Sequence, residues 1–185
     1  ETMDTINRQV DDIKNLVDEF SNFARMPAPN MHECNIKTII ENAVSLFDLE
    51  KNKILIDYNK KSLDCLVKCD ESQINRVFNN LIINSIHAIE AKFKNKLGGK
   101  IFIDGNVEAK YIKIKIFDNG QGLVHKEADL LKPYFSTKDK NIGTGLGLSI
   151  VEKIISEHEG NFHIYNIEDE SGACSEFTLR LYNER

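Results

Sequence analysis

The first 25 residues repeat apolar side chains at helical spacing. Gaps of three and four residues alternate along this stretch, which predicts an amphipathic helix with a narrow a/d stripe. The stripe consists of Met3, Ile6, Val10, Ile13, Val17, Phe20 and Ala24. Pro27 and Pro29 end the pattern, because proline lacks the amide donor that a helix interior needs. Two interpretations remain open: the helix packs on the following domain, or it forms a seam with other helices.

After Pro29 the chain shows both helical and strand patterns. Apolar residues at helical spacing predict helices over 36–49, 71–94 and 145–157. Alternating apolar residues predict strands over 53–58, 64–68, 100–108, 111–117, 161–167 and 173–182. The core-facing positions of the longest helix are Ile74, Val77, Phe78, Leu81, Ser85, Ala88 and Ile89. Helices followed by runs of neighbouring strands predict an α+β sandwich, in which helices cover one face of a mixed sheet.

Composition and charge narrow the class of protein. Of the 185 residues, 41% are hydrophobic and 29% are charged, the balance of a folded soluble chain. The formal net charge of −5 argues against a dedicated nucleic-acid binder. Residues 1–25 carry six acidic and three basic side chains, so a net charge of −3 falls on the N-terminal helix. No apolar run approaches the roughly 18 residues of a membrane span, and we expect no membrane contact.

The four cysteines are Cys34, Cys65, Cys69 and Cys174. None forms a CxxC pair, which favours reduced thiols in a cytoplasmic compartment. A zinc site that combines His32 with Cys34, Cys65 and Cys69 is conceivable, although these spacings fit no zinc template. The alternation of Cys65, Val67 and Cys69 instead predicts one buried face of a strand.

Two asparagines stand out in the helix predicted over 71–94. Asn80 and Asn84 are four residues apart, so they share a face that lies opposite the apolar stripe. An amide oxygen can bind a hard cation such as Mg²⁺ beside phosphate. The alternative is a pair of solvated asparagines.

A second polar motif, 118–122, directly follows a predicted strand. Asp118 at the end of this strand is placed to accept a hydrogen bond from an exocyclic amine. Gly120 and Gly122 would let a flat ring approach the backbone. An Asn-Gly hairpin turn is the alternative, but the residues that follow do not read as a returning strand.

A third motif, 143–148, opens a predicted amphipathic helix with three glycines. It fits neither the Rossmann nor the P-loop pattern, but glycines at a helix N-terminus favour phosphate binding. About twenty residues without clear periodicity separate it from the second motif, and they carry Lys126, Lys132, Lys138 and Lys140. Such a segment between an adenine-type and a phosphate-type site indicates a nucleotide lid or, alternatively, a surface loop.

The motifs together resemble those of sensor histidine kinases. NNLIINSIHAI resembles the N box, DNGQG the G1 box, PYFSTK the F box and GTGLGLSI the G2 box, in the family's order. The resemblance covers residues 36–182, and the F and G2 boxes are similar to the nitrogen-regulation branch. The N-terminal heptad helix resembles the second helix of the family's dimerisation and phosphotransfer hairpin.

The resemblance implies a fold and a domain organisation. Residues 1–26 would be part of the dimerisation and histidine-phosphotransfer domain, 27–35 a linker and 36–185 the catalytic domain. The catalytic domain would be a Bergerat-type α/β sandwich that binds ATP and Mg²⁺. We expect the chain to be a piece of a longer cytoplasmic protein, with or without an anchor in the bacterial inner membrane.

The resemblance also implies the site residues. Asn84 would ligate Mg²⁺, Asp118 would read the adenine amine, and Thr178 would help to hold the adenine through water. His87 is either close to the phosphates or a solvated histidine. The implied ATP-binding set is Asn80, Asn84, His87, Asp118, Gly120, Gly122, Phe135, Thr137, Lys138, Gly143, Thr144, Gly145, Leu146, Gly147, Leu148 and Thr178. Of these, Phe135, Thr137 and Lys138 would belong to the lid.

The implied activity is ATP-dependent phosphorylation of a histidine in a homodimer, followed by transfer to an aspartate of a response-regulator receiver domain. The acceptor histidine belongs on a preceding helix, and no histidine lies on the heptad helix, so this chain alone is not expected to autophosphorylate. Related ATPases carry a glutamate where this chain has Asn80, and an amide cannot act as a general base. Two alternatives stay open: a serine kinase of the anti-sigma-factor type, and a nucleotide-binding module without transfer activity.

Overall fold

The computed structural model describes residues 25–47, 54–94, 97–132, 145–168 and 171–182, together with Val10, Lys14, Val17 and Ser21. These four isolated residues are helical, and Val10 and Val17 expose more than half of their surface. The rest of the expected heptad helix lies outside the described residues. Its partner therefore stays a prediction.

A mixed five-stranded sheet forms one layer of the fold. The strands are β2 (Ile54–Tyr58), β4 (Gly99–Glu108), β5 (Tyr111–Asp118), β6 (Phe162–Asn166) and β7 (Ala173–Arg180). Their order is β2-β4-β5-β7-β6; β2 pairs with β4 in parallel, and the other neighbours are antiparallel. The inward isoleucines expected from the alternation of β4 and β5 are all buried: Ile101, Ile103, Ile112, Ile114 and Ile116.

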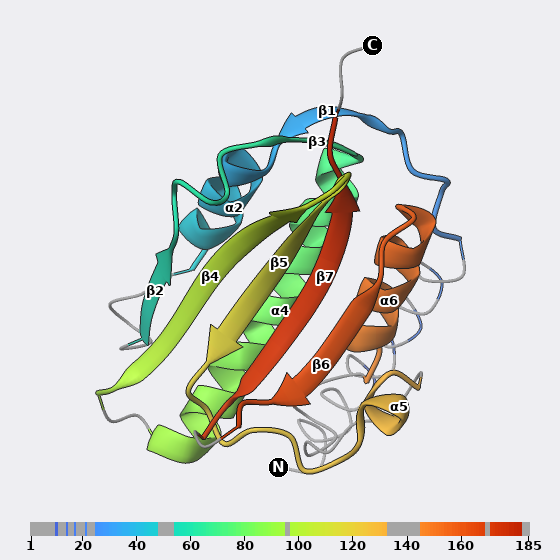
Figure 1. The fold of residues 1–185 in the computed structure, drawn as a ribbon. Helices are drawn as coiled ribbons and strands as arrows, with labels where there is room; N and C mark the ends of the chain where they lie inside the picture. The colour runs from blue at the N-terminus through green and yellow to red at the C-terminus, as the bar shows by residue number, and fades with distance from the viewer. Residues whose placement is uncertain are drawn as a thin grey trace.

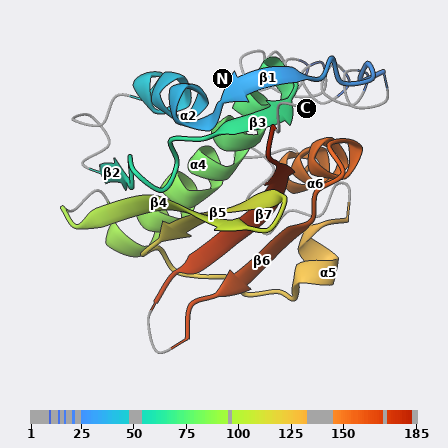
Figure 2. The same ribbon diagram turned by 45° about the horizontal axis from the view of Figure 1, so that its top comes forward.

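Three helices form the second layer. Helices α2 (Ile36–Ser45), α4 (Glu71–Phe93) and α6 (Gly147–Glu157) lie behind the sheet in Figure 1 and together on one side of it in Figure 2. Phe78 of α4 meets Phe177 of β7 edge to face, with ring centroids 5.6 Å apart, at the centre of the core. The expected mixed sheet with helices on one face is confirmed.

Polar side chains cap the N-termini of α2 and α4. Asn35 caps α2, because its Oδ1 accepts from the amides of Lys37 and Thr38. Asp70 caps α4 through the amide of Gln73. The helix predicted over 36–49 is shorter in the structure and ends at Ser45.

A small antiparallel ribbon lies at the N-terminal end of α4. It pairs β1 (His32–Asn35) with β3 (Leu66–Cys69), so residues 32–35 form a strand where the sequence indicated only linker. The bridge between Val67 and Leu181 joins this ribbon to the end of β7. On β3, Val67 and Cys69 are fully buried as expected, whereas Cys65 precedes the strand and is half-buried.

The remaining short helix, α5 (Glu127–Leu130), lies beside the edge strand β6 in both views. All four cysteines are free thiols. Among the described residues, no helix is long and apolar enough to cross a bilayer.

Candidate functional site

The polar face of α4 meets the first residue of α6. A Cβ atom placed on Gly147 would lie 3.0 Å from Asn80 Oδ1 and 3.9 Å from Asn84 Nδ2, so both carboxamides lie against the start of α6. The Asn80 Nδ2 donates to the carbonyl oxygen of Arg76 at 2.8 Å, which turns the amide oxygen toward Gly147. The fold thus brings together two of the three motifs found in the sequence.

The start of α6 has the features of an anion site. Leu146 occupies the N-cap position, and no side chain of the described residues caps the first turn of this helix. Gly145 has a positive φ of 72°, a conformation that costs glycine little and that turns the chain into the helix. Uncapped amides at the positive end of an eleven-residue helix favour a negatively charged group such as phosphate.

Asp118 lies buried at the end of β5, with 7% of its surface exposed. Its Oδ1 accepts from the Gly120 amide at 2.9 Å, and its Oδ2 accepts from the Ser85 hydroxyl at 3.2 Å. Burial raises the pKa of this carboxyl above its ordinary value, and the hydrogen bonds from Gly120, Ser85 and the Ala173 backbone oppose that rise. A carboxylate has about four acceptor positions, so Asp118 retains capacity for a donor such as an exocyclic amine.

Gly120 and Gly122, which follow Asp118, are each required to be glycine for a different structural reason. A Cβ on Gly120 would lie 2.7 Å from the backbone of Ala88, so Gly120 lets the loop pack on α4. The Gln121 amide donates to the Ala88 carbonyl at 3.1 Å and fixes the same contact. Gly122 has a positive φ of 79°. The approach of a ring to these glycines remains a prediction.

A further glycine, Gly172, was not singled out from the sequence. It has a φ of 140°, and a Cβ there would clash with the backbone carbonyl of Asp118. The position therefore needs glycine for the chain to pass behind Asp118. The Ser171-Gly172 pair is a sequence signal for a turn, and it could have drawn attention to this position.

Two side chains anchor the segment that leaves this loop. The Asn166 carboxamide accepts from the Leu123 amide at 2.6 Å and donates to the Leu123 carbonyl at 3.0 Å. The Glu127 carboxylate accepts from the Ile164 amide at 2.9 Å, on the edge strand β6. These contacts fix the first residues of the expected lid to the sheet. Sequence reasoning missed both, because each depends on a partner about 40 positions away.

Thr178 is not close to Asp118. It is paired with Lys113 in the register of β5 and β7, whereas Phe117, the neighbour of Asp118, is paired with Cys174. Thr178 Oγ1 accepts from the Asn161 amide at 2.9 Å, near the other end of the strand. The alternation of β7 places Thr178 on the face of the sheet opposite the buried Phe177 and Leu179. The expected adenine contact of Thr178 does not agree with this placement.

Two serines lie on the Asp118 side of the sheet instead. Ser175 is buried, is paired with Ile116, and shares the helix-facing side of β7 with Phe177. Ser85 is buried on α4 and donates to Asp118. Each serine interrupts an otherwise apolar face, Ser85 on α4 and Ser175 on β7, and this pattern could have identified both as candidate site residues.

The remaining predicted site residues have separate outcomes. His87 is half-buried on α4, one turn after Asn84, and Leu148 is half-buried against the core at the start of α6. The others lie outside the described residues: Phe135, Thr137, Lys138, Gly143 and Thr144.

The residues present fit a hard divalent cation beside phosphate. Asn80 and Asn84 supply carboxamides at the start of α6, and Mg²⁺ prefers oxygen ligands and keeps several waters. This donor set is sparse, as expected for an ion that is held mainly by phosphate oxygens.

Comparison with known proteins agrees with this geometry. Residues 69–184 match the family described as histidine kinase-, DNA gyrase B-, and HSP90-like ATPase. The chain is 36% identical over 179 residues to the nitrogen regulation protein NtrY of Azorhizobium caulinodans; the match covers 96% of this chain and 23% of the relative. The chain thus spans about a quarter of the length of that relative.

Solved structures give the same assignment. The catalytic domain of the histidine kinase ThkA superposes with a TM-score of 0.69 at 30% identity, over 82% of this chain and 96% of that one. ThkA in complex with the response regulator protein TrrA superposes with a TM-score of 0.76 at 23% identity, over 98% of this chain and 51% of that one. The fold and the family expected from the four sequence motifs are confirmed: this chain belongs to the histidine kinase-, DNA gyrase B- and HSP90-like ATPase family, and its homologues include NtrY-like sensor histidine kinases.

Proposed function

We propose that this chain binds ATP with Mg²⁺ as the catalytic part of a homodimeric sensor histidine kinase. The observation that carries the proposal is the placement of Asn84 and Ser85, which are adjacent on α4. Asn84 lies against the start of α6, and Ser85 donates to Asp118 at the end of β5. One helix thus aligns an anion site with a buried carboxylate, as a nucleotide requires for its phosphates and its base.

Asp118 would recognise the adenine. The Asp118 carboxylate accepts a hydrogen bond from the exocyclic amine. Ser85 and Gly120 donate to the two carboxylate oxygens and hold them in place. Hydrogen bonds to a charged acceptor contribute about 1.5–3 kcal/mol, so one such contact accounts for a large part of the affinity for the base. Gly120 lets the loop pack against α4, and this contact fixes the distance between Asp118 and the helix.

The phosphates would lie at the start of α6. The amides of its first turn donate to the phosphate oxygens, and the carboxamides of Asn80 and Asn84 complete the same side. Asn84 would hold Mg²⁺, which when bound neutralises phosphate charge and orients the terminal group. The first residues of the lid are tied to β6 by Asn166 and Glu127, so the chain leaves the loop in a fixed direction.

Transfer to a protein side chain fits this site better than hydrolysis. Asn80 cannot accept a proton from water, so the residues here position the nucleotide without a general base at this point of α4. In the full-length protein, a histidine nitrogen on the preceding helix attacks the γ-phosphorus of ATP. The new P–N bond forms as the bond to the bridging oxygen breaks, and ADP leaves.

The phosphoryl group would then move to an aspartate of a receiver domain, with return of the histidine to its free form. A response-regulator partner is supported by the solved complex of ThkA with TrrA, which shares the fold of this chain. A cytoplasmic location of this part follows from both substrates, ATP and the receiver domain.

The test is an autophosphorylation assay with the missing phosphotransfer helix restored ahead of residue 1. Incubation with radiolabelled ATP and Mg²⁺ should give an acid-labile, base-stable phosphoprotein, and Asp118→Asn should abolish the signal. Acid-stable phosphoserine in a partner would instead favour the anti-sigma-factor type of kinase. ATP binding in calorimetry without any transfer would favour a nucleotide-binding module.

A further inference from the structure

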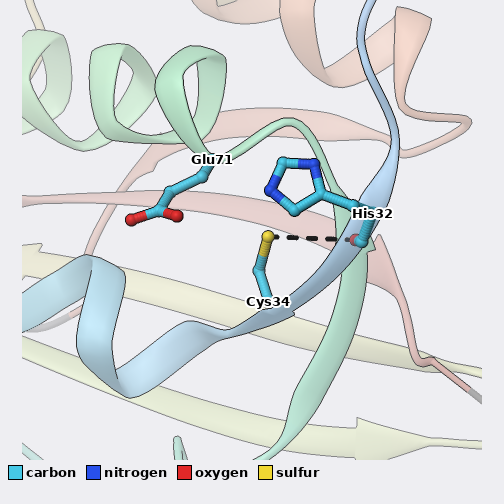
Figure 3. Close-up of side chains that lie close together, drawn as sticks. All are labelled: His32, Cys34 and Glu71. Atoms are coloured by element: carbon cyan, nitrogen blue, oxygen red, sulfur yellow. Dashed lines mark hydrogen bonds between the residues drawn. The ribbon is translucent and has the colours of Figure 1, made fainter.

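Three chemically different side chains converge where β1 meets the first turn of α4. The cluster consists of His32 and Cys34 on β1 and Glu71 on α4, and we call it the β1–α4 cluster. One imidazole nitrogen, the Cys34 sulfur and a Glu71 carboxylate oxygen all lie within 4.8 Å of one another. Figure 3 shows the three side chains close together, with the Cys34 sulfur below the His32 ring and the Glu71 carboxylate to one side.

The local fold creates this convergence. His32 and Cys34 are two positions apart on a strand, so they lie on the same face of the β1–β3 ribbon. The partner strand β3 ends at Cys69, and the chain enters α4 two residues later at Glu71. Asp70, between them, caps α4 and accepts from the Asn30 amide at 2.9 Å, which ties the start of β1 to the same turn.

The His32 ring is oriented for ligation. Its Nδ1 lies 2.9 Å from the carbonyl oxygen of Asn30, and a carbonyl only accepts, so Nδ1 carries the proton. The lone pair is then on Nε2, and Figure 3 shows this second nitrogen turned toward Glu71 and Cys34. A ligating histidine whose other nitrogen donates to a backbone carbonyl is the usual arrangement at protein metal sites.

The Cys34 thiol has only weak competing contacts. It is 5% exposed, and its sulfur lies 3.6 Å from the Cys69 carbonyl oxygen and 3.8 Å from that of His32, in the range of weak thiol hydrogen bonds. Burial raises the pKa of this thiol, and metal binding has to displace its proton. Cys69, opposite His32, is fully buried, and burial raises its pKa as well.

We propose that the β1–α4 cluster binds a zinc-class divalent ion through His32 Nε2, the Cys34 thiolate and the Glu71 carboxylate, with water as the fourth ligand. Imidazole, thiolate and carboxylate are the three ligand types that Zn²⁺ accepts, whereas Mg²⁺ and Ca²⁺ require oxygen ligands throughout. Tetrahedral ligands at about 2.0–2.3 Å from zinc are about 3.3–3.8 Å apart, so a small contraction closes the site. The exposed His32 and half-buried Glu71 side chains can make this movement.

This ligand set differs from the one that the sequence alone made conceivable. Cys65 and Cys69 are outside the cluster, and Glu71 takes part in their place. The site is also separate from the nucleotide site, because Glu71 is nine residues before Asn80 on α4, or about 13 Å along the helix axis. The bound ion would tie the segment that follows the N-terminal helix to the helix that carries the nucleotide-site asparagines. The proposal does not depend on the kinase assignment.

The test is metal binding by the 185-residue chain itself, kept reduced by a phosphine. Zn²⁺ is titrated in competition with a chromogenic chelator, and Co²⁺ is titrated as a spectroscopic probe. We expect one ion per chain, a near-ultraviolet charge-transfer band from thiolate to Co²⁺, and intense visible bands typical of tetrahedral Co²⁺. Cys34→Ser should abolish the charge-transfer band, and His32→Gln and Glu71→Gln should each weaken Zn²⁺ binding by about tenfold or more.

Matched controls separate this site from adventitious binding. Cys65→Ser removes a half-buried thiol beside β3, and His163→Gln removes an exposed histidine that faces Glu127. Both should leave the Zn²⁺ affinity and the Co²⁺ spectrum unchanged. Absence of stoichiometric binding in the wild-type chain, or a charge-transfer band that survives Cys34→Ser, would overturn the proposal. Because His32 is exposed, His32→Gln should fold normally, so an unchanged affinity in this variant is also decisive against it.

Discussion

The Ser85 hydroxyl donates to Asp118 Oδ2 at 3.2 Å, across 33 positions of sequence and between α4 and the end of β5. Both residues are buried. Asn84, the neighbour of Ser85, lies against Gly147 at the start of α6. This one contact therefore sets the position of the buried carboxylate relative to the anion site.

Asp118→Asn should strongly weaken ATP binding and leave the fold intact. In the variant, the amide oxygen can still accept from Gly120, and the amide nitrogen can donate to the Ser85 oxygen, so both local contacts persist. An amide nitrogen facing the adenine amine repels it, and we expect the affinity to fall about 100-fold, as for loss of a charged hydrogen bond. Isothermal titration calorimetry measures this. Wild-type affinity in Asp118→Asn would contradict the assigned role.

The stability of Asp118→Asn relative to the wild type should increase as the pH rises. Burial raises the pKa of Asp118 above its model-peptide value of 3.8, so above that pH the folded chain binds more protons than the unfolded chain. The free energy of unfolding that depends on this group then decreases with rising pH, up to the folded-state pKa. Asp118→Asn lacks this dependence. Urea unfolding between pH 4 and pH 8 should show the variant gaining on the wild type as pH rises, and a constant difference would exclude the effect.

Ser175→Ala and Thr178→Ala should have different consequences. Ser175 is buried on the Asp118 side of β7, so loss of its hydroxyl should weaken ATP binding about fivefold, the effect of one neutral hydrogen bond. Thr178 accepts from the Asn161 amide on the other face, so its loss should cost about 1 kcal/mol of stability and leave the ATP affinity unchanged. Calorimetry and urea unfolding on both variants decide this. The reverse pattern would restore Thr178 as the adenine contact.

Gly147→Ala should weaken nucleotide binding although alanine is the better helix former. The added Cβ would lie 3.0 Å from Asn80 Oδ1, closer than ordinary contact, so the Asn80 carboxamide must shift. We expect a loss of ATP affinity of about tenfold, the lower end of the cost of overpacking. Ser156→Ala, at an exposed position of the same helix, is the matched control and should bind normally. Equal affinities in the two variants would argue that α6 does not abut the bound nucleotide.

The sequence predicted the two layers and most of the site because both have local patterns. The spacing of Asn80 and Asn84 placed them on one face, and the pattern of residues 111–117 placed Asp118 at the end of a strand. The contact between Gly147 and the asparagines could not be predicted, because it depends on how α6 packs on α4. The pairing of β1 with β3 was missed for the same reason, since four residues carry too short a pattern.

Thr178 shows that one available signal was overlooked. Phe177 and Leu179 on either side of it are apolar and fully buried, so simple alternation already assigns Thr178 to the outer face of the sheet. Ser175, two positions before Phe177, has the parity that faces the helices. Parity within the strand therefore favours Ser175 over Thr178 as the residue expected to contact the adenine.

Asn166→Ala should loosen the start of the lid without disturbing the sheet. The Asn166 carboxamide makes two hydrogen bonds to the backbone of Leu123, at 2.6 Å and 3.0 Å, and an alanine side chain can make neither. Loss of these bonds should cost about 1–2 kcal/mol of local stability, so the Leu123 amide should exchange with deuterium about tenfold faster or more. The control is Tyr165→Phe, which removes a hydroxyl that contacts Glu176 and Cys174 and not Leu123. If the Leu123 amide exchanges at the same rate in Asn166→Ala and Tyr165→Phe, Asn166 does not hold the lid to β6.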